Sequence, residues 1–194
     1  MQHLQEIAGL PAEHFETFYL RAIRRFAECV QSLPSQANGA LQGLLNEGLA
    51  RGMVALQYHL HEYSEQSQDP LLLFSIFTAG LCRDLGKLIT NQRVVLTKED
   101  GEFLSHWNPF EGSMMGQAEF YKAYPQGKSY QRLNIPATYL LARQVLGKQG
   151  FLWLRCMHQV GQGLKYLPRW RQWYLWLLPP SVQKVTGRLM GNQY

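Results

Sequence analysis

The stretch FTAGLCRDLGKLIT, residues 77–90, decides the fold, because it closes an apolar run and then introduces three charges. The run covers residues 71–82 without a charged side chain. A segment that is apolar on all sides predicts a central, buried helix, which we expect to continue to the end of the stretch. Arg83, Asp84 and Lys87 would then share one stripe of that helix. The sequence therefore predicts a charged notch on a buried helix.

Helical patterns continue on both sides of this stretch. Apolar residues recur every three or four positions, which predicts helices over residues 11–33, 40–63, 134–146 and 151–167. Gly43, Gly48 and Gly52 lie inside the second of these, where glycine lowers helix propensity. We expect them to allow close packing against a neighbouring helix.

One part of the chain predicts strands instead. Two short apolar runs flank the turn sequence Glu99-Asp100-Gly101, which indicates a small β-hairpin near residues 93–106. A short helix is expected at residues 117–124. The predicted fold class is therefore mainly all-α, a helical bundle with one hairpin.

Length and composition indicate a folded domain. The chain has 194 residues, 46% of them hydrophobic, enough to bury a core. The three cysteines are widely spaced and form no disulfide or metal pattern, so we expect reduced core residues. No signal peptide is recognisable, and the longest apolar run is too short to span a bilayer. We expect a cytoplasmic protein without a membrane span.

Charge is divided unevenly along the chain. Residues 120–194 hold eleven Lys and Arg residues and no Asp or Glu, whereas residues 1–119 hold eight against fourteen. This asymmetry favours a polyanionic partner or an acidic protein partner for the second part. The alternative is that the two parts neutralise each other when they pack.

The basic part ends in a segment rich in aromatic residues. Cations mixed with aromatic rings are typical of surfaces that bind single-stranded nucleic acid. The candidate nucleic-acid-binding residues are therefore Lys165, Arg169, Trp170, Arg171 and Trp173. If this segment forms a short helix, its mixture of Trp and Leu with Arg also suits binding to a membrane surface. A third interpretation is that the aromatic side chains cap the core.

The sequence LCRDLGK, residues 81–87, resembles the LLHDIGK signature of the HD superfamily of metal-dependent phosphohydrolases. Four ordered blocks, at residues 6–34, 39–52, 79–95 and 101–112, resemble the N-terminal domain of TraI-type relaxases of the MobH class. The resemblance covers about residues 3–160. It implies an HD-type helical domain over residues 1–165, with residues 166–194 as a basic aromatic extension packed on it.

The chain departs from this family at nearly every metal ligand. The resemblance places Asn46 and Arg83 where histidines should stand, and only Asp84 remains. A guanidinium has no lone pair for a metal, but Arg83 or Lys87 can neutralise Asp84. We therefore interpret Asn46, Arg83, Asp84 and Lys87 as a vestigial site closed by a salt bridge, and we expect no catalytic residues, metal or cofactor. The alternative is an exposed helix end.

The function expected from these features is that of an inactive member of the HD superfamily rather than an enzyme. It would act as a binding or regulatory module in DNA processing by a conjugative or integrative element, with DNA bound at low specificity or a protein partner. One alternative is a relaxase-like phosphohydrolase or nuclease with rebuilt ligands. Another is an interaction module for an acidic protein.

Overall fold

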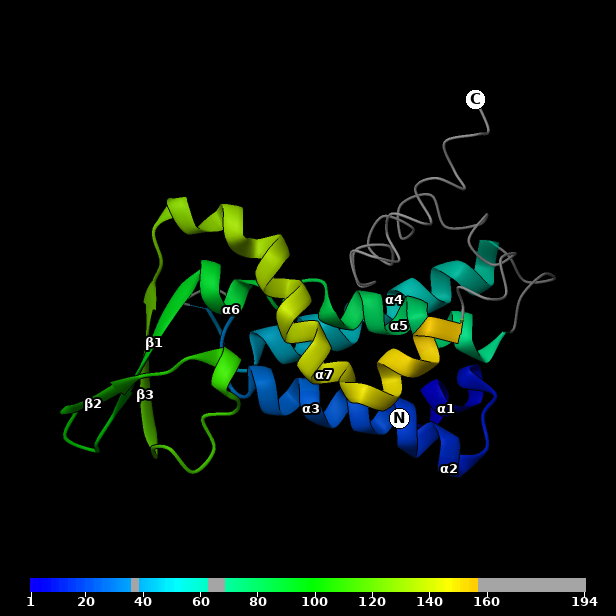
Figure 1. Cartoon of the computed structure of the whole chain (residues 1–194), viewed down its shortest axis with the longest axis horizontal. Coiled ribbons are helices and arrows are strands. Elements are labelled where there is room, and N and C mark those ends of the chain that lie inside the picture. Colours follow the sequence, from blue (N-terminus) through cyan, green and yellow to red (C-terminus); the bar gives the residue numbers. More distant parts are fainter. Residues whose placement is uncertain (36–38, 63–68, 157–194) are drawn as a thin grey trace.

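The computed structural model describes residues 1–35, 39–62 and 69–156. These residues are mainly helical, with one three-stranded antiparallel sheet. The sheet lies at one end of the molecule, and α1 (Gln2–Ala8) and α2 (Ala12–Phe15) lie at the other (Figure 1). The predicted class, mainly α with a small β element, is confirmed. Within the described residues no helix is long and apolar enough to cross a membrane.

The first long helix is built from three consecutive pieces. α2 passes into the π-helical turn η1 (Glu16–Leu20) and then into α3 (Arg21–Val30), with right-handed helical backbone at each junction. This confirms the helix predicted over residues 11–33, except that it ends at Val30, before the positive φ of Gln31. Its buried face carries Phe15 and Tyr19, whose rings stack with centroids 5.2 Å apart.

The centre of the molecule is the pair formed by α4 (Gly43–Glu62) and α5 (Pro70–Cys82). α5 begins at Asp69, whose carboxylate accepts a hydrogen bond from the Leu71 backbone N–H at 2.9 Å, a normal N-cap. Residues 71–82 are all buried, as the apolar run predicted. Cys29 and Cys82 are free and buried, and burial raises the pKa of the Cys29 thiol to about 12.

Glycines let α4 and α5 approach closely. A Cβ on Gly52 would lie 2.8 Å from the Phe77 ring, and a Cβ on Gly80 would lie 2.8 Å from the Arg51 carbonyl oxygen. Gly48 in turn leaves no room for a side chain beside Phe26. The close packing expected for the glycines of this helix is confirmed for Gly48 and Gly52.

The helix predicted to run from the apolar stretch to Thr90 is interrupted. α5 ends at Cys82, residues 83–86 form turns, and α6 (Lys87–Thr90) begins afterwards. The reason is tertiary: α7 (Asn134–Cys156) packs on the turn, and the Gly86 N–H donates to Thr138 Oγ1 at 2.9 Å. A Cβ on Gly86 would collide with Asn134.

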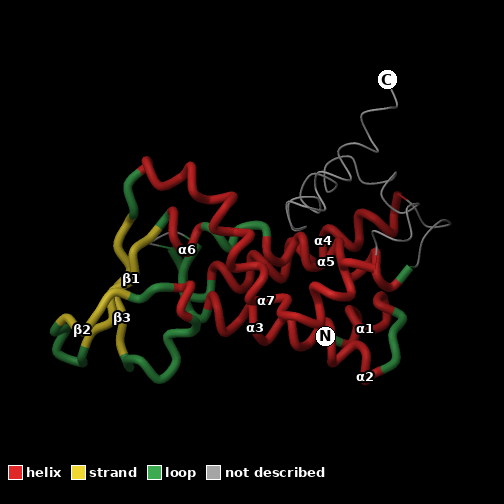
Figure 2. The backbone as a smooth tube through the Cα atoms, in the orientation of Figure 1, coloured by secondary structure: helices red, strands yellow, loops and turns green. Residues whose placement is uncertain are grey.

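The sheet has the order β2-β1-β3, with β1 (Gln92–Thr97) between β2 (Phe103–His106) and β3 (Phe120–Pro125). Figure 2 shows the three strands together at one end of the molecule. The predicted hairpin is confirmed, with its turn closed by a hydrogen bond from the Lys98 N–H to the Glu102 carbonyl at 3.0 Å. The short helix expected at residues 117–124 is wrong, because this segment pairs with the free edge of β1.

The remaining elements connect the sheet to α7. η2 (Pro109–Glu111) and η3 (Lys128–Leu133) are short 3-10 helices. α7 starts at Asn134, as predicted, and is kinked at Gly147, where φ is 61°. Gly147 thus breaks the helix, as expected, but the chain resumes a helical path at once. The predicted extension at residues 166–194 lies outside the described residues.

Candidate functional site

Four charged side chains meet where α4 passes the turn that follows α5. Glu47 and Arg51 come from α4, Asp84 from the turn, and Lys87 from the start of α6. We call these four residues the ion-pair cluster. Arg51 contacts Asp84 Oδ2 directly, and Lys87 Nζ lies 3.1 Å from the same oxygen. Arg51 also lies 2.9 Å from Glu47 Oε2, and Lys87 lies 3.8 Å from it.

The local sequence explains why these groups converge. Glu47 and Arg51 are four residues apart on α4, so they lie on one helix face. The contact of Gly80 with the Arg51 backbone brings that face against the end of α5. The turn then places Asp84 beside α4, where only 19% of its side chain is exposed.

Burial and charge change the acidity of two members of the cluster. A hydrogen bond from Ser35 lowers the pKa of the Glu47 carboxyl, and the positive charges of Lys87 and Arg51 lower it further. Burial lowers the pKa of the Lys87 ammonium, and the nearby Arg51 adds to this effect. Two carboxylates face two cations, so the cluster is formally neutral.

The structure brings together only part of the predicted site. Asp84 pairs with Lys87, one of the two expected partners. Arg83, the other candidate partner, is exposed and forms no ion pair within residues 1–35, 39–62 and 69–156. Asn46 is also exposed.

Sequence reasoning missed Glu47 and Arg51. The signal that could have found them is their spacing of four residues on a helix that also carries close-packing glycines. That spacing predicts an ion pair on α4, but only the packing of α4 on α5 brings it to Asp84. The partner of Asp84 thus comes from a distant part of the sequence.

The residues at this position do not fit a divalent metal. Arg83 and Asn46 stand where the resemblance expects ligands, and both are directed to solvent. Asp84 Oδ2 already receives two cationic side chains, neither of which offers a lone pair to a metal. Among the described residues, no three His, Cys, Asp or Glu side chains gather in a way that could hold a metal ion.

The residues predicted to bind nucleic acid through the aromatic segment are Lys165, Arg169, Trp170, Arg171 and Trp173. All five lie outside the described residues.

Comparison with models of protein families identifies a match over most of the chain. The model of the TraI_2 family, described as a putative helicase, matches residues 1–166. No curated protein matches the sequence significantly. The match covers most of the chain and includes all elements of the described fold.

Proposed function

Because the chain belongs to the TraI_2 family, we propose that it is a DNA-handling module of a conjugative or integrative element that does not itself hydrolyse phosphoesters. The match makes residues 1–166 a TraI-like domain, which relates the chain to DNA processing in conjugative transfer. The further step, from a DNA-processing family to a non-catalytic member, rests on the ion-pair cluster.

The observation that supports a non-catalytic role is the double contact on Asp84 Oδ2. A carboxylate binds a catalytic metal through oxygen lone pairs. Here Arg51 and Lys87 both approach that oxygen, and Glu47 completes a neutral set. A divalent cation at this place would have to displace two cations and would meet their repulsion. The cluster therefore serves the fold rather than hydrolysis.

The DNA-binding part of the proposal rests on the charge of the second part of the chain. Residues 120–194 carry eleven Lys and Arg residues and no acidic residue. We propose that Lys165, Arg169 and Arg171 contact phosphates and that Trp170 and Trp173 take part in the binding. Binding of this kind has little sequence preference and falls steeply with salt, because phosphate neutralisation releases counterions.

The test uses the full chain. We expect no stoichiometric zinc, iron or manganese by elemental analysis and no hydrolysis of DNA or of a chromogenic phosphodiester. Fluorescence anisotropy at low salt should detect DNA binding, which Arg169→Glu with Arg171→Glu weakens about tenfold or more. The matched control is Arg143→Glu with Lys148→Glu, which makes the same charge change at exposed positions of α7.

Two results would contradict the proposal. About one metal per chain, lost on Asp84→Ala together with hydrolysis, would establish the alternative of an active enzyme with rebuilt ligands. If neither single- nor double-stranded DNA is bound, an acidic protein becomes the expected partner of the basic segment.

A further inference from the structure

The three-stranded sheet has one face on the helical body. Its other face is exposed on β2 and β3, although Val95 and Thr97 of the central strand are buried. Directly paired residues of an antiparallel sheet share a face. Val94 and Leu96 belong to the inner face and are buried in the core. Tyr121, paired with Leu96, packs against the same core, and its hydroxyl donates to the Ser32 carbonyl at 3.2 Å. The alternate residues of the sheet therefore form the other face.

We call this other face the outer sheet face. The pairs that define it are Arg93 with Tyr124, Val95 with His106 and Lys122, and Thr97 with Phe103 and Phe120. The β-bulge next to Thr97 brings Phe103 to this side of the sheet. The evidence is that the Phe103 ring lies 5.2 Å from the ring of His106. Three rings, an imidazole and two cations thus surround Val95 and Thr97.

The three rings are exposed, although the strands that carry them are hydrogen-bonded into the sheet. Phe103 is 56% exposed, and Phe120 and Tyr124 are each 42% exposed. Phe120 lies two strand spacings from Phe103, roughly 10 Å, and four residues from Tyr124, roughly 13 Å. Each of the three residues keeps between 42% and 56% of its surface exposed. Their exposed faces remain available to a ligand that is itself flat and apolar.

The charge of the outer sheet face is positive. Arg93 Cζ lies 5.6 Å from the Tyr124 ring centroid, within cation–π range. Lys122 extends beside Gly101 at the hairpin turn. Neither cation forms an ion pair within the described residues, and none of the residues that define the face is acidic.

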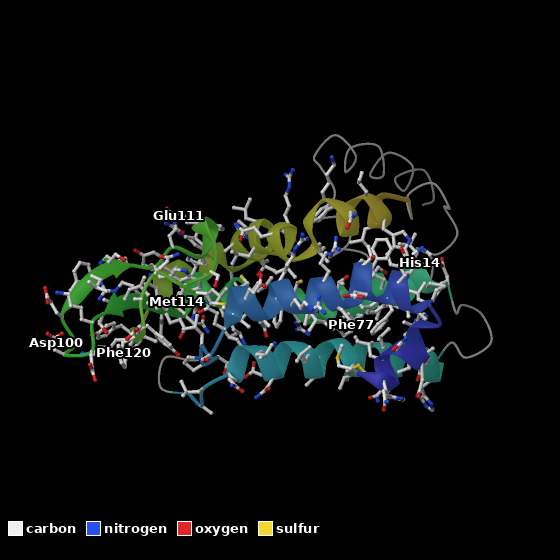
Figure 3. The ribbon with its side chains drawn as sticks, turned by 90° about the horizontal axis from the view of Figure 1, so that it is seen from below. His14, Phe77, Asp100, Glu111, Met114 and Phe120 are labelled. Carbon is white, nitrogen blue, oxygen red and sulfur yellow. The ribbon has the colours of Figure 1, made fainter. Side chains whose placement is uncertain are left out.

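Acidic side chains lie in the hairpin turn beside the face. Asp100 and Phe120 both lie at the sheet end of the molecule, opposite His14 (Figure 3). In the hairpin turn, Glu102 is paired with Lys98 at 2.6 Å and Asp100 accepts a hydrogen bond from the Glu102 N–H. Glu102 and Asp100 are thus engaged within the turn, whereas Glu99 in the turn and Glu119 before Phe120 are exposed and form no ion pair among the described residues. The rings and cations on the strands keep their exposed surface.

We infer that the outer sheet face binds single-stranded DNA, with bases stacked on Phe103, Phe120 and Tyr124 and phosphates held by Arg93 and Lys122. This inference rests on the proposed function and names the strand form that it handles. A flat surface can stack only unpaired bases, and stacking tolerates any sequence because every base has a π-face. A second copy of the chain is a poorer occupant, because it would bring like charges together.

The experiment separates stacking from charge. Phe120→Ile with Tyr124→Ile removes two rings and keeps side chains that favour strands. Anisotropy with a fluorescein-labelled oligo(dT) of about 16 nucleotides should show affinity reduced about tenfold or more, with an unchanged dependence on salt. Arg93→Gln with Lys122→Gln should instead reduce the slope of log K against log salt by about 1.4. The affinity for duplex DNA of the same length should fall less than threefold in the ring variant.

Matched substitutions elsewhere serve as controls. Tyr58→Leu removes an exposed ring from α4, and Lys148→Gln removes an exposed charge from α7; Tyr58→Leu should bind oligo(dT) as the unchanged protein does. Circular dichroism and thermal melts verify that each variant is folded. Photocrosslinking of bromodeoxyuridine-containing oligo(dT), followed by peptide mapping, should place adducts in residues 93–124.

The outcomes distinguish the inference from the proposed function. If the ring variant binds oligo(dT) as tightly as the unchanged protein and adducts map outside residues 93–124, the inference is overturned while DNA binding stands. If DNA is hydrolysed but the ring variant still loses affinity, the non-catalytic role fails and the sheet site stands. Absence of any DNA binding overturns both.

Discussion

The ion-pair cluster and the outer sheet face use similar cations in opposite ways. In the cluster, Arg51 and Lys87 meet Asp84 and Glu47, so every charge has a partner within the chain. On the sheet, Arg93 and Lys122 lie among exposed rings and pair with no carboxylate of the described residues. The comparison shows that a cation paired with a carboxylate of the chain stabilises the fold, whereas a cation without such a partner is a candidate for binding a ligand.

The largest expected effect concerns the helix contact that positions the cluster. In Gly80→Ala, the added Cβ would lie 2.8 Å from the Arg51 carbonyl oxygen, a backbone atom that cannot move aside. We expect a loss of about 3 kcal/mol in the free energy of unfolding, measured by urea denaturation.

Gly127→Ala is the matched control for this change. Its backbone has a φ of −66°, and an added Cβ would meet only the Ser129 hydroxyl at 3.7 Å. We expect a change within about 0.5 kcal/mol. Equal stability of the two variants would show that α4 and α5 are not held at this distance.

Removal of Asp84 should have the next largest effect. Asp84→Ala leaves Arg51 and Lys87 facing each other without their shared acceptor, with 33% and 24% of their side chains exposed. We expect a loss of about 2 kcal/mol, less than for a fully buried pair because solvent screens both cations. Thermal and urea denaturation measure it.

Arg83→Ala removes the neighbouring charge, which is exposed. We expect a change within about 0.5 kcal/mol. A larger loss for Arg83→Ala than for Asp84→Ala would contradict the assignment of Arg51 as the partner.

A smaller effect follows from the lowered pKa of Glu47. A carboxyl group whose pKa is lower in the folded state stabilises the protein at pH values above its unfolded pKa, about 4.3. This contribution is lost as the pH falls through the lower, folded value. Glu47→Gln should cost about 0.5 kcal/mol at pH 7, because 38% of the side chain is exposed. Urea denaturation at several pH values should show the two proteins converging in acid.

The smallest effect on stability is expected on the outer sheet face. Phe120→Ile with Tyr124→Ile replaces exposed side chains by residues that also favour strands. The free energy of unfolding should therefore change by about 0.5 kcal/mol or less. A loss as large as that of Asp84→Ala would mean that the rings support the sheet itself. That result would remove the contrast between the two regions.

Much of the helical framework could be predicted from the sequence. The apolar run at residues 71–82 predicted a buried helix, and Asp69 with Pro70 marked its start. Hairpin signals around Glu99-Asp100-Gly101 located β1 and β2. These features depend on side-chain periodicity and on local backbone preferences, which act over a few residues.

The sequence failed where distant segments compete with local preference. Residues 117–124 favour a helix locally, but the edge of β1 offers hydrogen bonds that make residues 120–125 a strand. The helix predicted through Arg83 breaks because α7 packs against Gly86. In both places the deciding partner lies tens of residues away along the chain.

The sequence by itself determined the mainly helical class and the hairpin, since both follow from residue types and their spacing. Only the tertiary structure decided that Arg51 is the partner of Asp84 and that Phe103, Phe120 and Tyr124 share one exposed face. The physical reason is that ion pairs and sheet faces depend on distances through space, which are fixed by how α4 packs on α5 and by the register of β1 with its two neighbours.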